Sequence, residues 1–120
     1  MVKLDAETLC QLREVHEISV RTVKHPNTPV VIWAVVADEE VFVRSVYGAR
    51  GRWYRDLRAG GAATLEFAGR TVPVQAIPET DPAAIERASG EFLRKYRPSP
   101  YAPAMVKSEI LSTTLRLEPR

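Results

Sequence analysis

The chain has 120 residues, of which 45% are hydrophobic and 27% are charged, and its formal net charge is +2. This length predicts a single domain over residues 1–120, large enough to bury one core without disulfides. A membrane-spanning helix is excluded because no run of 18 apolar residues occurs. The first residues lack the apolar core of a signal peptide, so we expect a cytoplasmic location.

The first half of the chain predicts one helix and three strands. A short helix is expected over residues 5–14. Residues 16–24 alternate between polar and apolar types, which indicates a half-buried strand. Residues 30–37 are apolar throughout and rich in β-branched side chains, which indicates the most buried strand. An acidic hairpin turn at 38–40 then leads into a returning strand over 41–46.

The second half predicts a short helix over residues 52–58 and a hairpin of strands over 63–67 and 71–77. An Asp-Pro pair starts a long helix over 82–97, because aspartate caps helices and proline suits their first turn. A last strand follows over 111–117. Six antiparallel strands with two or three peripheral helices predict an α+β fold, mainly β, in the form of a small closed or partly open barrel.

The spacing of apolar residues in the expected strands and helices also predicts which side chains point inward. In the last strand, Leu115 and Leu117 should point inward and Thr114 outward. Leu93 is expected on the apolar stripe of the long helix, and Cys10 on the apolar side of the first helix. A buried, inert thiol is therefore the expected state of the single cysteine.

Residues 44–58 carry a concentrated positive charge. Five arginines and one acid, Asp56, give this segment +4 (5 − 1), so the rest of the chain sums to −2 (2 − 4). The segment contains Gly48 and Gly51 in a loop that runs into a helix start at Arg52. Backbone N–H groups and guanidinium forks in such a loop are suited to bind an anion such as a phosphate.

The sequence offers little acid–base, nucleophilic or metal chemistry. His16 and His25 have no paired acids at metal-ligand spacing, so no metal site is predicted. The signature motifs of serine hydrolases, zinc proteases and P-loop proteins are absent. If the protein is an enzyme, a redox cofactor is expected to carry the reaction, and no catalytic side chain is assigned.

Residues 29–67, which include the positively charged segment, resemble the corresponding part of the flavin-binding split β-barrels. That superfamily includes pyridoxamine-phosphate-oxidase-like proteins and deazaflavin-dependent nitroreductases, and the chain is most similar to a small family of unknown function within it. The similar features are an apolar strand, an acidic turn, a strand ending in VRS, a Gly/Arg loop and a short helix with Trp53. The resemblance implies a six-stranded antiparallel split β-barrel built from residues 16–77 and 111–117.

The resemblance also implies a cofactor, FMN or its deazaflavin analogue, bound in a groove that is usually shared by the subunits of a homodimer. Arginines of the VRS strand end and of the loop would reach the phosphate, while strand residues would lie beside the ring system. Tyr96 and Tyr101 flank a proline-rich break and are candidates for a substrate mouth. The cofactor-binding candidates are Lys24, Ile32, Trp33, Arg44, Ser45, Arg50, Gly51, Arg52 and Trp53.

Three functions remain open at this point. The favoured one is hydride transfer to a small organic acceptor such as a quinone, a nitro compound or an unsaturated compound. The alternatives are a non-catalytic dimer that binds a cofactor or ligand, and, less favoured because the basic cluster is short, a nucleic-acid-binding barrel. Core packing is the alternative explanation for Trp33 and Trp53, and a solvated charge is the alternative for the arginines.

Overall fold

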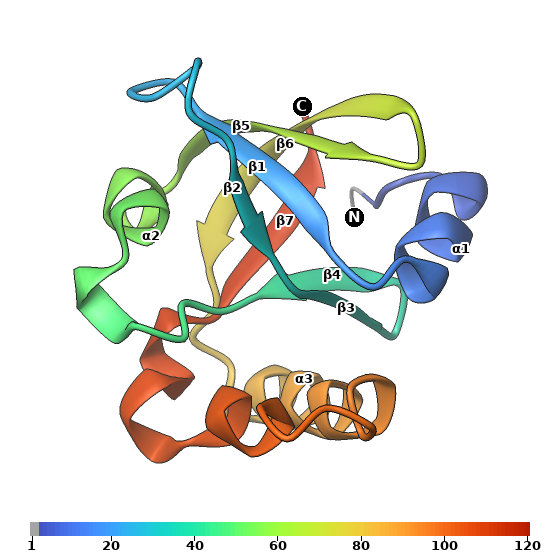
Figure 1. The fold of residues 1–120 in the computed structure, drawn as a ribbon, viewed down its shortest axis with the longest axis vertical. Coiled ribbons are helices and arrows are strands. Elements are labelled where there is room, and N and C mark those ends of the chain that lie inside the picture. The colour runs from blue at the N-terminus through green and yellow to red at the C-terminus, as the bar shows by residue number, and fades with distance from the viewer. Residues whose placement is uncertain (1–2) are drawn as a thin grey trace.

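The computed structural model describes residues 3–120, in which seven antiparallel strands curl into a nearly closed barrel (Figure 1). The strand order in the sheet is β2-β1-β5-β6-β7-β4-β3. The strands are β1 (Ile18–Thr22), β2 (Val30–Ile32), β3 (Ala34–Ala37), β4 (Glu40–Val43), β5 (Gly61–Phe67), β6 (Arg70–Pro78) and β7 (Leu115–Pro119). The helices are α1 (Ala6–Glu14), α2 (Arg52–Leu57) and α3 (Pro82–Lys95), with short 3-10 helices η1 (Gly48–Arg50), η2 (Ala102–Val106) and η3 (Ser108–Thr113).

The single strand expected over residues 30–37 is two strands, because the chain changes partner at Trp33. Ile32 is the last residue of β2 and pairs with β1, whereas Ala34 begins β3 and pairs with β4. The two ends of the sheet therefore meet at one residue, which nearly closes the barrel. The expected count of six strands is wrong for this reason, while the mainly antiparallel α+β architecture is confirmed for the described residues.

The strands on either side of the acidic hairpin separate two apolar layers. Val36 and Val41 belong to the cluster inside the barrel, whereas Val35 and Phe42 pack with Phe92 of α3 on the outside. Both faces of β3 are thus covered, which explains why this part of the sequence is apolar at every position rather than alternating.

Helix α3 begins after Asp81, whose carboxylate accepts a hydrogen bond of 3.1 Å from the backbone N–H two residues on. It turns Ala88 and Phe92 toward the sheet. Leu93 is 45% exposed, so its expected place on the buried stripe is wrong. The reason is geometric, since one residue rotates a helix position by about 100° away from the face that Phe92 occupies.

Two further side chains differ from expectation. Leu115 and Leu117 are buried as predicted, but Thr114 is fully buried as well, because its hydroxyl accepts a hydrogen bond from the Arg44 guanidinium. Cys10 is exposed, since α1 turns its leucines inward and leaves the cysteine on the solvent side. The last strand also begins later than expected, because η3 precedes it.

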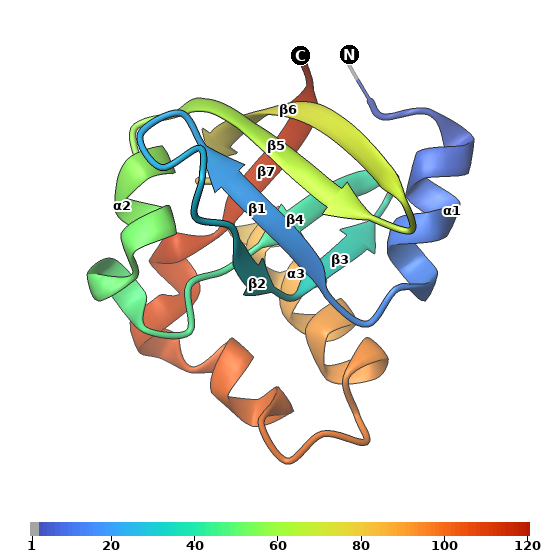
Figure 2. The same cartoon turned by 45° about the horizontal axis from the view of Figure 1, so that its top comes forward.

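Helices α1 and α2 lie on opposite sides of the barrel, and α3 with η2 and η3 covers the end below the β3–β4 hairpin (Figures 1 and 2). Within residues 3–120 no helix has the length and apolar character needed to cross a membrane. The arrangement brings α2 and the segments after β4 close to β2 and η2, which are distant from them in sequence.

Candidate functional site

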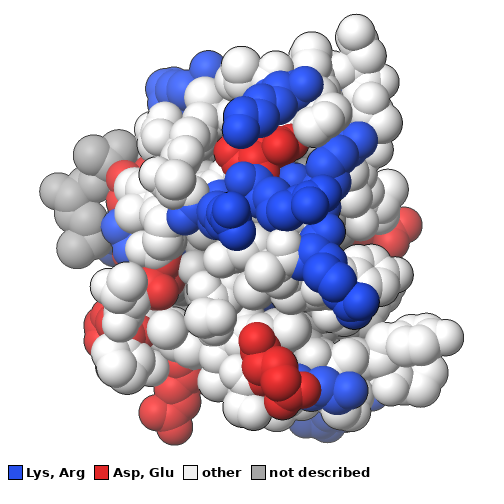
Figure 3. All heavy atoms as spheres, turned by 90° about the vertical axis from the view of Figure 1, so that its left-hand side faces the viewer, with Lys and Arg blue, Asp and Glu red and all other residues white. Residues whose placement is uncertain are grey.

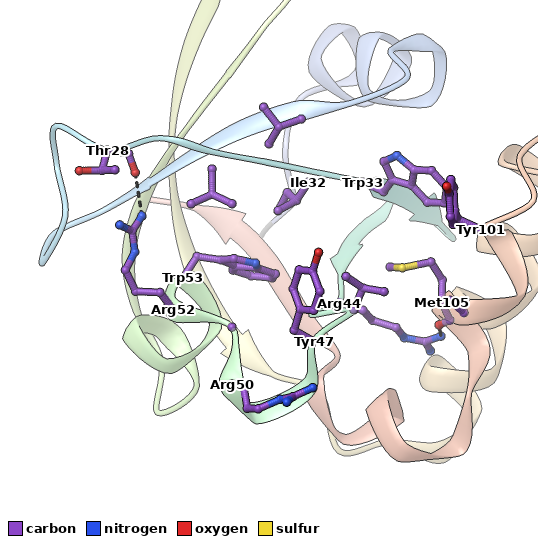
Figure 4. Close-up of a pocket in the computed structure, with 15 residues that line it drawn as sticks. Thr28, Ile32, Trp33, Arg44, Tyr47, Arg50, Arg52, Trp53, Tyr101 and Met105 are labelled. Atoms are coloured by element: carbon purple, nitrogen blue, oxygen red, sulfur yellow. Dashed lines mark hydrogen bonds between the residues drawn. The ribbon is translucent and has the colours of Figure 1, made fainter.

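A cavity of about 1130 Å³ opens between β2, the loop after β4, the start of α2 and η2 (Figure 4). It lies beside the break at Trp33, where the wall of the barrel passes from β2 to β3. Its walls are formed by aromatic, aliphatic and arginine side chains. The lining residues are Thr28, Val30, Val31, Ile32, Trp33, Arg44, Val46, Tyr47, Arg50, Gly51, Arg52, Trp53, Tyr101, Ala104 and Met105.

The loop after β4 takes its shape from one serine and two glycines. The Ser45 hydroxyl donates a hydrogen bond of 2.7 Å to the carbonyl of Gly48, which itself adopts a φ of +64°. Gly51 packs against the same hydroxyl so closely that an added Cβ would lie 2.5 Å from the Ser45 Oγ. These residues therefore shape the loop, and Ser45 does not line the cavity.

Arg44 lies at the base of the cavity, and its guanidinium is held by its own chain. It is 2% exposed and donates to the hydroxyls of Thr114 (2.8 Å) and Ser89 (2.9 Å). It also donates to the carbonyls of Met105 (3.0 Å) and Ile85 (2.7 Å). Burial lowers the pKa of Arg44 to about 10. Arg44 therefore connects the barrel to α3 and η2 through hydrogen bonds, without a carboxylate partner.

Two arginines of the loop and helix are differently placed. Arg50 is exposed on the floor of the cavity. Arg52 donates a hydrogen bond of 2.9 Å from Nη2 to the carbonyl of Thr28, across the cavity edge (Figure 4). Its Nε atom is buried and has no hydrogen-bond partner. This atom is therefore enclosed by the protein and is not open to the cavity.

The positive charge of this segment is not neutralised locally. Within residues 3–120, none of the arginines at 44, 50, 52, 55 and 58 forms an ion pair with a carboxylate. Asp56, the acid among them, accepts instead from Thr22 and His25. No acidic side chain lines the cavity, which therefore favours an anionic ligand.

Aromatic and aliphatic side chains form the rest of the wall. Tyr47 and Tyr101 are 71% and 72% exposed, and Val31 and Val46 are 58% and 46% exposed. All four line the cavity, so its mouth is bordered by apolar surface. Trp53 is only 6% exposed and belongs to the barrel core, and it also lines the cavity.

Tyr96 lies behind Trp33 and not at the mouth. The two rings stack with centroids 3.9 Å apart. The Tyr96 hydroxyl accepts from the N–H of Ala34 (3.2 Å) and lies 2.8 Å from the carbonyl oxygen of His16, while Lys95 Nζ donates to the Ala34 carbonyl (2.7 Å). Burial raises the pKa of Tyr96 to about 12 and lowers that of Lys95 to about 8. Both side chains supply hydrogen bonds to backbone groups at the strand break.

The structure brings together most of the residues predicted from the sequence. Lys24, Ser45 and Tyr96 do not line the cavity, and the Arg44 guanidinium is occupied by its own chain. The predicted residues that do line it are Ile32, Trp33, Arg44, Arg50, Gly51, Arg52, Trp53 and Tyr101.

Sequence reasoning missed several wall residues. Tyr47 lies in the basic loop, between Arg44 and Arg50, and this position was the one feature of the sequence that could have indicated a cavity residue. Thr28 and Met105 come from a turn and a 3-10 helix, for which no periodic pattern exists.

The lining residues offer binding surfaces and little acid–base chemistry. No aspartate, glutamate, histidine, cysteine or lysine is among them. Elsewhere in residues 3–120 no group of three or more histidines, cysteines or carboxylates is placed to hold a metal ion. The arrangement can bind a planar anionic molecule between aromatic walls and arginines, and such a molecule would have to bring its own reactivity.

Comparison with known proteins shows the family. A model of the family described as uncharacterized protein conserved in bacteria (DUF2255) matches residues 6–117, and the chain belongs to this family. No protein of curated function matches the sequence.

Solved structures show the same fold at low identity. The conserved hypothetical protein Rv2991 from Mycobacterium tuberculosis is 16% identical, with a TM-score of 0.64 over 100% of this chain and 82% of that one. A "putative general stress protein 26" from Jannaschia sp. CCS1 is 11% identical, with a TM-score of 0.68 over 94% of this chain and 71% of that one. At these identities the similarity concerns the fold alone.

Proposed function

We propose that this family member binds FMN or a deazaflavin analogue in the cavity and acts as an oxidoreductase. When bound, such a cofactor supplies the hydride that is passed to a small organic acceptor, namely a quinone, a nitro compound or an unsaturated compound. We also propose that the chain is related to the flavin-binding split β-barrels, as residues 29–67 suggest, and that the protein is cytoplasmic, as the sequence led us to expect.

The observation that carries the proposal is the pair of arginines, Arg50 and Arg52, that line the cavity without an ion-pair partner while no acid is among the lining residues. Phosphate oxygens would accept hydrogen bonds from the outer N–H groups of these two guanidiniums. Each charge-assisted hydrogen bond of this kind stabilises a complex by about 1.5–3 kcal/mol. The residues present therefore fit the phosphate of a flavin-type cofactor.

The other walls fit a planar ring. Trp33, Tyr47 and Tyr101 present aromatic surface, and Ile32 adds an aliphatic contact. Ligand pockets typically measure about 300–1,000 Å³. The cavity of about 1130 Å³ therefore has room for a cofactor and an acceptor together.

The proposal includes a homodimer. Val31, Val46, Tyr47 and Tyr101 leave apolar surface exposed around the cavity mouth. A second copy of the chain placed across this mouth would cover that surface and complete the enclosure of the ring. Light scattering should report twice the chain mass at micromolar concentration, and a clean monomer mass would contradict this part of the proposal.

A non-catalytic cofactor-binding dimer is the second candidate. It is favoured by the composition of the lining, which holds no carboxylate, imidazole, thiol or amine to move a proton. Both candidates predict binding of the cofactor, and only the first predicts turnover.

The test is a visible absorption spectrum of the purified protein, repeated after addition of FMN and of the deazaflavin. A spectrum perturbed by one cofactor, followed by reduction of a quinone or nitroaromatic acceptor, supports the oxidoreductase. Binding without turnover supports the second candidate. Absence of binding to either cofactor removes both.

A further inference from the structure

A basic face surrounds α2, on the side of the molecule away from α1. We define it by Lys24, Arg52, Arg55 and Arg58, which come from the loop after β1 and from α2 with its C-terminal cap. Figure 3 shows lysine and arginine side chains gathered over the upper part of this face, around a small acidic spot. Lys24, Arg55 and Arg58 are exposed, and Arg55 and Arg58 do not line the cavity.

The acid within this face is withdrawn from the cations. The Asp56 carboxylate is 8% exposed and accepts from the Thr22 hydroxyl (2.6 Å) and from His25 Nδ1 (2.7 Å). Burial alone would raise the pKa of Asp56, but the hydrogen bonds from Thr22 and His25 keep it below its ordinary value. Asp56 therefore fastens the loop to α2 and leaves the surrounding arginines without a counter-charge.

Arginines elsewhere in residues 3–120 are found both with and without ion pairs. Arg21, Arg87 and Arg94 each meet a carboxylate within 2.9 Å or less, whereas Arg13 and Arg97 form no ion pair. What sets the basic face apart is the close spacing of its unpaired cations. Arg55 and Arg58 stand three residues apart at the end of a short helix, where like charges repel each other and an external acid would relieve the repulsion.

We propose that the basic face is a docking surface for an acidic protein partner that presents carboxylates at helical spacing. Arginines three residues apart on α2 are separated by about 4.5 Å along its axis. Carboxylates three or four residues apart on a partner helix repeat at a similar distance and accept bidentate hydrogen bonds from guanidinium groups.

An apolar contact point favours a protein over a nucleic acid. Val23 is 72% exposed beside Thr22 and Lys24, within the same face. Protein interfaces combine an apolar centre with a charged rim, whereas single-stranded nucleic acids require aromatic stacking surfaces. The face is also confined to one loop and one short helix, while nucleic-acid domains carry a broad basic surface.

The probe is a fluorescein-labelled, alanine-rich helical peptide with glutamates every third or fourth residue along one face and one leucine among them. It should be roughly 20 residues long, because shorter helices are marginal in water. Fluorescence anisotropy with the full chain should show saturable binding that weakens when salt is raised from about 0.05 to about 0.3 M.

The double variant Arg55→Glu/Arg58→Glu should weaken peptide binding by about tenfold or more, because it replaces attraction with repulsion. The matched control is Arg13→Glu/Arg97→Glu, which changes net charge equally at exposed arginines outside the face. Val23→Ser should weaken binding by a few fold, and it tests the apolar contact without altering charge.

Three outcomes would overturn the proposal. They are no saturable binding by the wild-type protein, equal loss in the control pair, and tighter binding of oligo(dT) than of the peptide, which would indicate a nucleic-acid surface. A thermal melt of each variant excludes unfolding as the cause, and the salt dependence of the wild-type protein tests the charge contribution without any substitution. Cofactor binding by the double variant should be unchanged, so this proposal and the proposed function fail separately.

Discussion

Two groups of polar side chains near the cavity are alike in residue type and opposite in environment. The anchor group is saturated with hydrogen bonds from its own chain, whereas the rim group faces the cavity with donors or ring surfaces still free. The anchor group consists of Arg44, Lys95 and Tyr96, and the rim group of Tyr47, Arg50, Arg52 and Tyr101.

The difference shows that the role of an arginine or a tyrosine depends on nearby backbone acceptors. Arg44 meets a carbonyl on α3 and another on η2. Tyr96 and Lys95 do the same where the strand breaks at Trp33. Arg52 has only one such carbonyl, that of Thr28. Substitutions should therefore affect stability in the anchor group and ligand binding in the rim group.

The largest effect is expected for Arg44→Ala. The variant loses every hydrogen bond of the guanidinium, to Thr114, Ser89 and the carbonyls of Ile85 and Met105. The free energy of unfolding should fall by about 3 kcal/mol or more, measured by urea denaturation. Arg44→Lys is the matched control, since it keeps the charge but not the planar fork, and it should recover only part of the loss. A variant as stable as the wild-type protein would show that Arg44 is not an anchor.

Arg52→Ala should produce the reverse pattern. Its affinity for the cofactor should fall roughly tenfold, equivalent to about 1.4 kcal/mol, because a guanidinium that lines the cavity is lost. The free energy of unfolding should change by less than about 1 kcal/mol. Titration followed by absorption gives the affinity, with Arg58→Ala as the control outside the cavity. Equal affinities for Arg52→Ala and wild type would remove the distinction between the two groups.

A pair of tyrosine variants sharpens the comparison with a smaller effect. Tyr96→Phe removes the hydroxyl that serves Ala34 and His16, and should cost about 1–2 kcal/mol of stability. Tyr101→Phe removes an exposed hydroxyl and should change stability by less than about 0.5 kcal/mol. Urea denaturation midpoints of the two variants test this difference. A larger loss of stability for Tyr101→Phe than for Tyr96→Phe would contradict the placement of Tyr96 in the anchor group and of Tyr101 in the rim group.

The smallest effect is a pH dependence from Lys95. Burial lowers its pKa to about 8 in the folded protein from the ordinary 10.5, so the unfolded chain binds more protons between these values. The free energy of unfolding should therefore rise with pH from about 8 towards 10. Above this range Tyr96 has the opposite effect, because burial raises its pKa to about 12 and the folded protein then binds more protons than the unfolded chain. Urea midpoints at several pH values test this, and Lys95→Met should lack the rise. A rise of equal size in that variant would assign it to another group.

Much of the fold could be predicted because it follows from local patterns. The hairpins, the capped start of α3 and the heavily buried strand before the acidic turn all follow from short runs of residues. The concentration of positive charge near the cavity was equally visible in the run of arginines from 44 to 58. The break at Trp33 was not visible, because β2 and β3 contain the same residue types and differ only in their pairing partners.

The sequence by itself determined which residue types stand near the cavity and that their charge is positive, because these are properties of one short segment. Only the tertiary structure decided which of those cations are available to a ligand. Arg44 and Arg52 are eight residues apart, and the carbonyls that hold the first come from α3 and η2, about forty to sixty residues further along the chain. A hydrogen-bonding partner that arrives from a distant segment leaves no trace in the local pattern of residues.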